Sequence, residues 1–444
     1  MLSKKANATA QLGFYSTFEE QLSHRHPLYI LANKIEWNVF EEAFKKHYAE
    51  DGRPAKPIRL MVALLLLKHL RNLSDESVVE QWTENVYYQY FSGETAYACG
   101  VPCEASELVH FRKRIGEEGV ELILKESIRV NEGDADDGHV SVDTTVEEKN
   151  ITFPTDDKLH KKIIHRCRAI SEGEGLPVRQ RYTRTLKRLS LAQRFRNHPK
   201  NKAKARKANR KVKTIAGRLV REVERHLPAG SKHHNELVLF KKVLAQKRSD
   251  SGKVYSLHEP AVQCISKGKE HKKYEFGNKV SLVHTQTTGV IVGALGLRNE
   301  YDGHTLEKAL EQTTRLRGQA PQTATVDRGY KGKSKIGDTL IQIPKPFNQK
   351  QLTHYKQTKL KKCFRRRAAI EPVISHLKTD HRLGRNFYKG VFGDNINIML
   401  AAAAFNFKRM MNKWKASLLN FLQNFLFAIH LLLWQLNPTA KFQN

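Results

Sequence analysis

Two aspartates stand at positions where strands would present them to a shared site. Asp143 interrupts the β-branched run HVSVDTTV (139–146), although strands disfavour aspartate. Asp327 ends the short apolar run TATV (323–326), and Gly329 follows it closely. Catalytic groups favour the carboxyl ends of strands in open α/β sheets, so two such strands in one sheet would bring both carboxylates together. Each aspartate taken alone is equally a polar position on a half-solvated strand face.

Glu371 supplies a third carboxylate in the basic stretch CFRRRAAIEPVISHLKTDHRLGRN. The spacing of Ile370, Ile374 and Leu377 predicts a helix there. Three carboxylates without thiols or paired histidines form a hard-oxygen donor set, which suits Mg²⁺ or Mn²⁺. Two such ions roughly 3.5–4 Å apart can activate a nucleophile and stabilise a leaving oxygen. The three acids therefore predict a metal-dependent phosphoryl-transfer site.

Arg367 and Lys378 flank Glu371 at offsets of −4 and +7. On a continuous helix these offsets share a face, so both cations could hold a phosphate near the metals. The alternative is that they only solvate the helix surface. Pro372 leaves two possibilities open, because the helix either begins near Glu371 or is kinked there. If the helix begins there, Arg367 leaves the shared face.

The charge of the chain indicates a polyanionic partner. It carries 77 Lys and Arg against 45 Asp and Glu, a formal net charge of +32, which favours nucleic acid. Residues 158–225 hold 23 basic and 4 acidic residues. Their centre, PKNKAKARKANRKVKT, consists of good helix formers, so we expect an arm with basic side chains on most faces. A solvated charge run is the alternative. The predicted DNA-contacting residues are Lys202, Lys204, Arg206, Lys207, Arg210 and Lys211 in this arm, and Arg367, Lys378, Arg382 and Arg385 around Glu371.

Other segments predict the elements that surround these residues. Apolar and capping patterns indicate helices over 57–72, 74–91 and 106–116. The last carries Arg112, Lys113 and Arg114, so the three helices form either a helix-turn-helix module or a plain bundle. Residues 277–285 and 289–297 read as a hairpin, followed by an amphipathic helix over 304–318.

The termini and cysteines bear on the compartment. Five scattered cysteines do not form a disulfide framework, and the N-terminus lacks an apolar leader, so we expect a cytoplasmic protein. Residues 417–436 are apolar at 14 of 20 positions, enough to cross a bilayer. Ser417, Asn420 and Asn424 recur at helical spacing, which instead favours a helix packed against protein. We expect no membrane span.

The order Asp143, Asp327, Glu371 resembles the bacterial insertion-sequence DDE transposases. DRGYKG surrounds the second acid, and Phe364, Arg367, Glu371 and Lys378 follow the pattern F-x2-R-x3-E-x6-K. VDTTVEEKNITFPTD, GLPVRQRYTRTLK, YEFGNKVSL and IEPVISHLKTDHRLGRNFYKG resemble the insertion-sequence-five group over nearly the whole chain. The family typically has Tyr where Phe364 stands, so a stacking role survives there and a hydroxyl contact does not.

The resemblance implies an α/β fold: an RNase H-like mixed sheet flanked by helices, with an all-α N-terminal domain and a basic helical insertion. The implied domains are a helical region over 1–135, which would bind DNA if it forms a helix-turn-helix, a catalytic core over 136–154 and 255–390, a DNA-contacting insertion over 155–254, and C-terminal helices over 391–444. Asp143, Asp327 and Glu371 would be the catalytic residues and would hold two Mg²⁺ or Mn²⁺ ions. His376 is the histidine best placed for a site role, and Asp302 and Asp394 are spare carboxylates.

The implied activity is cleavage at transposon ends, followed by attack of the freed 3′-hydroxyl on target DNA. It would need neither ATP nor a covalent enzyme intermediate. The implied partners are the terminal inverted repeats, target DNA and further copies of the chain. Two alternatives stay open: an inactive protein that only occupies transposon ends, and a metal-dependent nuclease without strand transfer.

Overall fold

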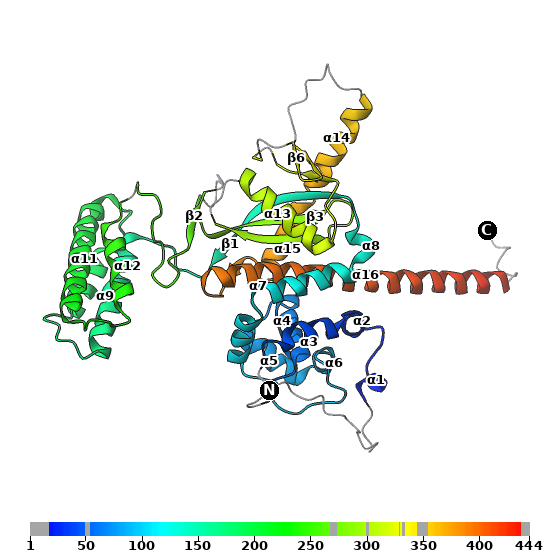
Figure 1. Cartoon of the computed structure of the whole chain (residues 1–444), viewed down its shortest axis with the longest axis horizontal. Helices are drawn as coiled ribbons and strands as arrows, with labels where there is room; N and C mark the ends of the chain where they lie inside the picture. The colour runs from blue at the N-terminus through cyan, green and yellow to red at the C-terminus, as the bar shows by residue number, and fades with distance from the viewer. Residues whose placement is uncertain are drawn as a thin grey trace, which may run out of the picture. The chain divides into compact units, whose positions relative to one another are not determined.

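The chain folds into two compact units in a computed structural model (Figure 1). The described residues are 17–48, 54–247, 249–266, 273–298, 302–327, 329–330, 334–343 and 354–436. The core unit comprises Met1–Glu147, Lys279–Tyr388 and Phe392–Asn444, and the helical unit comprises Glu148–Asn278 and Lys389–Val391. The core unit holds the predicted N-terminal region with most of the predicted catalytic core and C-terminal region, whereas the helical unit holds the predicted insertion (155–254) together with residues 148–154 and 255–278 of the predicted core.

A mixed sheet has most of its strands in the core unit. Its strands run in the order β2-β3-β1-β5-β7-β6, with β4 also beside β3 and β8 also beside β1. The predicted hairpin is present as an antiparallel pair, whereas β1, β5 and β7 are parallel neighbours. The strands are β1 (His139–Lys149), β2 (Gln263–Ile265), β3 (Glu275–Thr285), β4 (Ile291–Leu297), β5 (Thr323–Thr325), β6 (Lys335–Ile336), β7 (Thr339–Gln342) and β8 (Arg385–Asn386).

Helix α13 (Asp302–Arg317) packs closely against strand β4. The backbone N–H of Ala294 donates to Gln312 Oε1 at 2.8 Å. A Cβ at Gly293 would lie 2.5 Å from Thr313 Oγ1, so only glycine permits this approach. The helix predicted over 304–318 is therefore present and covers the hairpin.

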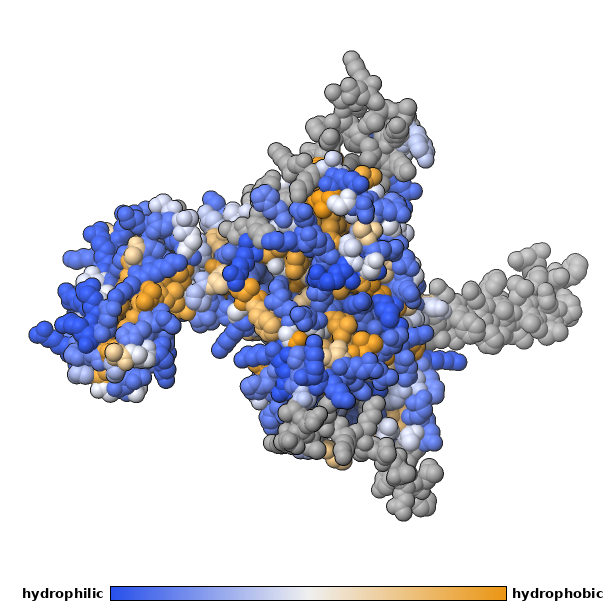
Figure 2. Space-filling view, viewed as in Figure 1, coloured by the Kyte–Doolittle hydropathy of each residue, from blue (hydrophilic) through white to orange (hydrophobic). Residues whose placement is uncertain are grey.

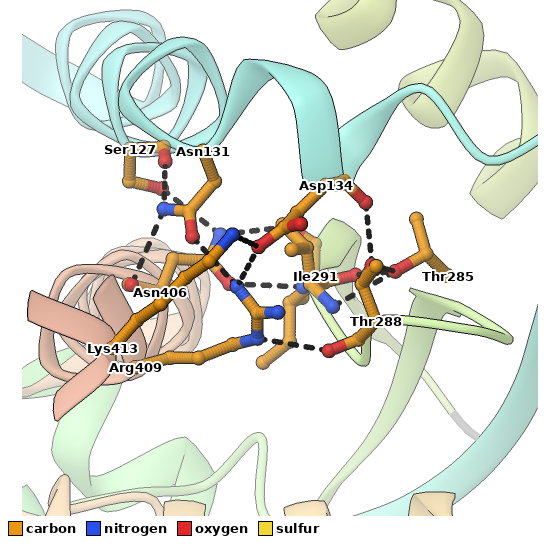
Figure 3. A network of polar contacts seen from close by, with 10 residues as sticks. Ser127, Asn131, Asp134, Thr285, Thr288, Ile291, Asn406, Arg409 and Lys413 are labelled. Carbon is orange, nitrogen blue, oxygen red and sulfur yellow. Dashed lines mark hydrogen bonds and ion pairs between the residues drawn. The ribbon is translucent and has the colours of Figure 1, made fainter. Parts of the chain in front are cut away.

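Helix α16 (Gly390–Leu436) is fastened to the edge of the sheet by Asn406 (Figure 3). The Asn406 side chain accepts from Ile291 N at 2.9 Å and donates to Ile291 O at 2.8 Å. It also donates to Ser127 Oγ on helix α7 (Ala105–Val130) at 3.1 Å. One buried amide therefore satisfies backbone groups of β4 and joins three elements.

Asp134 fastens the same helix one turn further along (Figure 3). Arg409 Nη1 and Lys413 Nζ donate to its carboxylate at 2.8 and 2.9 Å. Arg409 Nε also donates to the carbonyl of Thr288, in the turn between β3 and β4. Burial alone would raise the pKa of Asp134, but the two cations lower it overall. The charged carboxylate thus holds α16 against Glu132–Ala135, the short helix that precedes β1.

The N-terminal region is helical, as predicted. Helix α4 (Ile58–Leu70) is buried along most of its length, and Ser74 caps α5 (Asp75–Glu84) by accepting from Ser77 N at 3.0 Å. The helix expected over 74–91 is broken at Asn85, and the one over 106–116 continues past a non-helical Gly116 with φ 71°. The helices here are α1 (Phe18–Gln21), α2 (Pro27–Lys34), α3 (Trp37–Lys45), α4 (Ile58–Leu70), α5 (Asp75–Glu84), α6 (Val86–Phe91), α7 and α8 (Glu132–Ala135).

Arg112 does not face outward as a DNA-reading helix would require. Its guanidinium is buried and donates to both carboxylate oxygens of Asp75, at 2.7 and 2.8 Å. Lys68, also buried, donates to the same carboxylate at 2.8 Å. Both cations lie over the ring of Tyr388. At this position the bundle interpretation holds, because Arg112 serves packing between helices and not a groove contact.

The helical unit has a hydrophobic core of its own. Ile163, Cys167, Val212, Leu219 and Phe240 are among its buried residues. Helix α11 was expected to be an arm with basic side chains on most faces, and that expectation is wrong. One face of α11 is buried against its neighbours, so the basic side chains occupy the outer face. The helices are α9 (Asp156–Gly173), α10 (Thr183–Ala192), α11 (Pro199–His226) and α12 (His234–Ala245).

Several expectations concern side chains outside the described part of the chain: those of Asp302, Phe364 and the apolar stretch 418–436. The backbone of that stretch continues α16. Among the helices searched within the described residues, none is both long enough and apolar enough to cross a membrane.

We predict that Asp75→Ala destabilises the core unit by about 3–5 kcal/mol, because it leaves two buried cations without their shared carboxylate. Urea unfolding followed by circular dichroism measures the change. Glu76→Ala is the control, since Glu76 is exposed in the same helical turn. Equal stability of the two variants would contradict this role of Asp75.

Candidate active site

The pairing of β1 with β5 brings Asp143 and Asp327 side by side. The strands are parallel, with His139 opposite Thr323 and Ser141 opposite Thr325. Continuing that register by two residues places Asp143 opposite Asp327. Asp143 is still within β1, whereas Asp327 lies just beyond the carboxyl end of β5.

A chain of buried polar groups holds this register. Gln286 Nε2 donates to the carbonyl of Val140 at 3.3 Å and to Thr325 Oγ1 at 2.6 Å. Thr325 Oγ1 in turn donates to Gln342 Oε1 on β7 at 3.3 Å. The backbone N–H of Val326 donates to the Gln342 carbonyl at 3.0 Å. The ladder therefore extends to the residue before Asp327 and fixes where that carboxylate begins.

One guanidinium lies between the two aspartates. Arg367 Nη2 is 3.4 Å from Asp143 Oδ2 and 3.7 Å from Asp327 Oδ2. The side chains of Asp143 and Arg367 are 19% and 20% exposed, whereas that of Asp327 is 52% exposed. The pair is therefore open to solvent from the Asp327 side. Arg367 is the last residue of helix α14 (His354–Arg367).

Glu371 lies in the first turn of the next helix, α15 (Ile370–Asp380), and is exposed. The chain breaks helical continuity at Ala368 and Ala369, so Pro372 also falls in the first turn of α15, where proline is tolerated. Arg367 and Glu371 consequently belong to different helices. Of the two possibilities left open by Pro372, the structure shows the helix that begins near Glu371.

The structure brings two of the three predicted carboxylates together. Within the described part of the chain, no three His, Cys, Asp or Glu side chains come close enough to hold a metal ion. The donor set nevertheless fits a divalent cation. Asp143 and Asp327 offer oxygen ligands of the kind that Mg²⁺ and Mn²⁺ prefer. A cationic group, the Arg367 guanidinium, already lies between them.

Sequence reasoning overlooked Glu147, which shares a strand face with Asp143 because side chains alternate along β1. Glu147 is buried and accepts from Asn397 Nδ2 at 2.6 Å and Asn386 Nδ2 at 3.2 Å. Asn386 also donates to the buried Asp394 at 2.7 Å. Asp394 is thus a structural carboxylate, and these amides tie β8 and α16 to the strand that carries Asp143.

The other residues predicted near Glu371 lie on α15 and the segment after it. Arg382 donates to the carbonyl of Asn72 at 3.3 Å, Arg385 is exposed in β8, and Lys378 is half-buried. His376 is exposed and 2.8 Å from Asp380 on its own helix. This contact lies within α15 and does not involve the aspartate pair.

Two buried histidines clasp α4 to the end of α15. His69 Nδ1 donates to the carbonyl of His381 at 3.3 Å, and His381 Nδ1 donates to the carbonyl of His69 at 3.0 Å. A carbonyl only accepts, so both Nδ1 atoms carry a proton. Burial lowers the pKa of both side chains, well below its usual value for His69. The clasp is therefore made by two neutral imidazoles.

The helical unit contains an arginine-lined hollow of about 830 Å³ that sequence reasoning also missed. Arg179, Arg218, Arg221 and Arg225 line it, and within the described residues none of their guanidinium groups forms an ion pair. Glu222 accepts instead from the backbone N–H of Arg179 at 2.6 Å. The only signal was the arginine in GLPVRQ together with arginines three and four residues apart on α11.

The six basic residues predicted on α11, Lys202, Lys204, Arg206, Lys207, Arg210 and Lys211, are all exposed. Ala205, Ala208 and Val212 between them are buried. Hydrophilic side chains cover most of the visible face of this unit (Figure 2). The exposed basic face of α11 and the arginine-lined hollow together give the helical unit an outer surface suited to anions.

Two family models match the chain. One, described as Transposase domain (DUF772), covers residues 16–114, and the other, described as Transposase DDE domain, covers residues 246–407. The second match includes Asp327 and Glu371. The chain is also 40% identical over 190 residues to an uncharacterized protein, ORF8 in the nfe locus of Rhizobium meliloti. That match covers 42% of this chain and 92% of the relative. No solved structure matches.

We predict that acid weakens the core unit through the histidine clasp. An unfolded histidine binds a proton below about pH 6.5, whereas the folded pKa of His69 and His381 is lower, so stability falls as the pH drops from 6.5 towards the folded values. His69→Gln should reduce this slope by up to about 1.4 kcal/mol per pH unit. Urea unfolding at pH 7, 6 and 5.5 measures it, and the exposed His110→Gln is the control. An unchanged slope in His69→Gln would refute the assignment.

Proposed function

The chain belongs to the DDE transposases of insertion sequences, and from that membership we propose that it binds transposon ends and catalyses their Mg²⁺-dependent cleavage and strand transfer. The family acts on DNA by phosphoryl transfer and generally uses divalent metal ions. One observation carries the proposal for this chain. Asp143 and Asp327 meet on adjacent parallel strands although most of the helical unit lies between them in the sequence.

Asp143, Asp327 and Glu371 are the residues that we propose hold the metal ions. When bound, two such ions would promote attack on the phosphodiester and stabilise the leaving oxygen. Asp143 is fixed by its strand, and Asp327 is fixed by the β5–β7 ladder that ends beside it. Glu371 would join from the first turn of α15.

The reaction that we propose has two displacements at phosphorus. Water first cleaves the strand at the transposon end and leaves a 3′-hydroxyl, which then attacks a phosphodiester of the target DNA. The first step hydrolyses one phosphodiester. The second step exchanges a phosphodiester of the target for the new one, so it conserves a bond of the same kind and no nucleotide cofactor is needed. Lys378, Arg382 and Arg385 are the cations that we propose position the DNA backbone.

We propose that the helical unit grips DNA outside the reacting phosphates. Its exposed lysines and arginines on α11 would contact phosphate without reading bases. Arginine suits the hollow, because a guanidinium binds phosphate with two parallel hydrogen bonds. Joining two transposon ends requires two sets of these contacts, so we propose that copies of the chain assemble on DNA in the bacterial cytoplasm.

We predict that Asp143→Asn, Asp327→Asn and Glu371→Gln each reduce cleavage and joining of a labelled duplex from the element's own end by about 10³-fold or more. DNA binding should persist in all three. Gel assays with Mg²⁺ measure both products, and Asp338→Asn is the control, since Asp338 is exposed and carries no proposed role. Wild-type cleavage by any of the three variants would remove that residue from the site.

The same assay separates the alternative activities. A nuclease would give cut ends and no joined product, whereas an inactive end-binding protein would give neither while still shifting the duplex. Joined product that depends on Mg²⁺ is the outcome that supports strand transfer.

We predict that the double variant Arg218→Ala/Arg221→Ala weakens DNA binding more at low than at high salt. Loss of two phosphate contacts should lower the slope of log affinity against log salt by about 1.8. Fluorescence anisotropy between 50 and 300 mM KCl measures it. Arg184→Ala/Arg188→Ala on α10 removes the same charge outside the hollow and serves as the control. Equal slopes in the two double variants would exclude the hollow as a phosphate site.

A further inference from the structure

We propose that Arg367 is a placeholder cation that occupies the aspartate pair until divalent ions replace it. The inference rests on the proposed function, because it takes Asp143 and Asp327 to be metal ligands. It adds a regulatory role for Arg367. Metal ions bind only when the guanidinium leaves the aspartate pair, and a DNA phosphate is the group that the guanidinium would then bind.

The position of a single nitrogen carries the proposal. Arg367 Nη2 approaches both carboxylates, one oxygen of each aspartate. This is where a bridging cation would neutralise the pair. A divalent ion and a guanidinium repel each other, so the two cannot occupy this position together.

The contacts of Arg367 are long compared with other arginine–carboxylate pairs in the same chain. Arg112 reaches Asp75 at 2.7 and 2.8 Å, and Arg166 reaches Glu236 at 2.6 and 2.7 Å. Both of those pairs use two parallel hydrogen bonds. Arg367 instead divides one nitrogen between two acids at 3.4 and 3.7 Å. It is therefore held by charge more than by directed hydrogen bonds, which suits a cation that must exchange.

The rest of the guanidinium is incompletely used. Arg367 Nε is buried and has no hydrogen-bond partner among the described residues. A buried N–H group without an acceptor costs free energy. A second position of the guanidinium in which Nε has an acceptor therefore competes with the position seen here. A DNA phosphate would be such an acceptor, because its oxygens accept from two guanidinium nitrogens at once.

The location of Arg367 at the end of a helix permits the exchange. It is the last residue of α14, and the helical break at Ala368 and Ala369 separates it from α15. A side chain there can change direction without disturbing Glu371 on the following helix. By linkage, DNA that draws Arg367 away must raise the affinity for metal ions by the same factor as metal ions raise the affinity for DNA. Without DNA, Arg367 would keep the occupancy of the site by metal ions low.

The first test measures Mn²⁺ binding to the full-length protein without DNA, by electron paramagnetic resonance of the free ion. Arg367→Ala should bind Mn²⁺ about tenfold or more tightly than the wild type, because it removes a competing charge about 4 Å away. Arg367→Lys keeps the charge and should stay close to the wild type. Arg366→Ala is the matched control, since Arg366 is its exposed neighbour. Equal or weaker binding by Arg367→Ala would overturn the proposal.

Two aspartate variants separate this failure from failure of the proposed function. If Asp143→Asn and Asp327→Asn lose Mn²⁺ binding while Arg367→Ala binds as the wild type does, the metal site stands and the placeholder is wrong. If the aspartate variants bind Mn²⁺ normally, the proposed metal site itself is wrong, and the placeholder falls with it.

Thermal unfolding guards against a folding defect. In EDTA, Arg367→Ala should unfold at a lower temperature than the wild type, because the two carboxylates then repel each other, and Mn²⁺ should reverse the difference. A deficit that Mn²⁺ does not reverse would mark Arg367 as structural only and would overturn the proposal.

The last measurement tests the coupling to DNA. A duplex of the element's own end with a 3′-dideoxy terminus, which cannot be joined, should raise the Mn²⁺ affinity of the wild type and leave that of Arg367→Ala unchanged. The same increase in both proteins would show that DNA acts on the metal site without Arg367.

Discussion

The parallel pairing of β1 with β5 is the interaction on which the candidate site depends. It sets Asp143 opposite Asp327 by backbone hydrogen bonds, so neither side chain has to be positioned by loops. A slip of one residue would turn one carboxylate to the other face of the sheet. The buried chain from Gln286 through Thr325 to Gln342 opposes such a slip, because moving any member would leave buried polar groups without partners. Polar groups in this sheet thus determine a register that apolar packing alone would leave less specific.

Buried side-chain amides also join the sheet to the helices and strands around it. Asn406 binds both backbone groups of Ile291, and Asn386 and Asn397 bind the buried Glu147. Each amide joins segments that are far apart in the sequence, and each would cost stability if it lost a partner. Asn406 thereby holds β4, and Asn386 and Asn397 hold β1, each from a segment distant in the sequence. These contacts fix the strand that carries Asp143, the residue proposed as a metal ligand.

The sequence predicted what depends on local patterns. Alternation predicted the hairpin, Ser74 predicted the start of α5, and the acids at strand ends predicted the pair. Contacts between residues far apart in the sequence could not be predicted in this way. Arg112 looked exposed because its partner Asp75 lies on another helix, and nothing local reveals a buried ion pair. On α11, lysine and alanine content predicted helix correctly but hid the buried face, although Val212, Ile215 and Leu219 recur at helical spacing. The arginine-lined hollow joins a loop to α11 and has no continuous signature.

Arginine performs two different tasks in this chain, and contact geometry separates them. At Asp75 and Glu236, two short hydrogen bonds fix the guanidinium of Arg112 and of Arg166, and removing either partner would leave the other charge without its ion pair. At the aspartate pair, the contacts of Arg367 are longer and do not form two parallel hydrogen bonds, so the guanidinium is easier to replace. The difference follows from function under the proposal made here. A structural ion pair gains from being permanent, whereas two carboxylates that must accept metal ions need a partner that neutralises them when empty and is weak enough to be displaced.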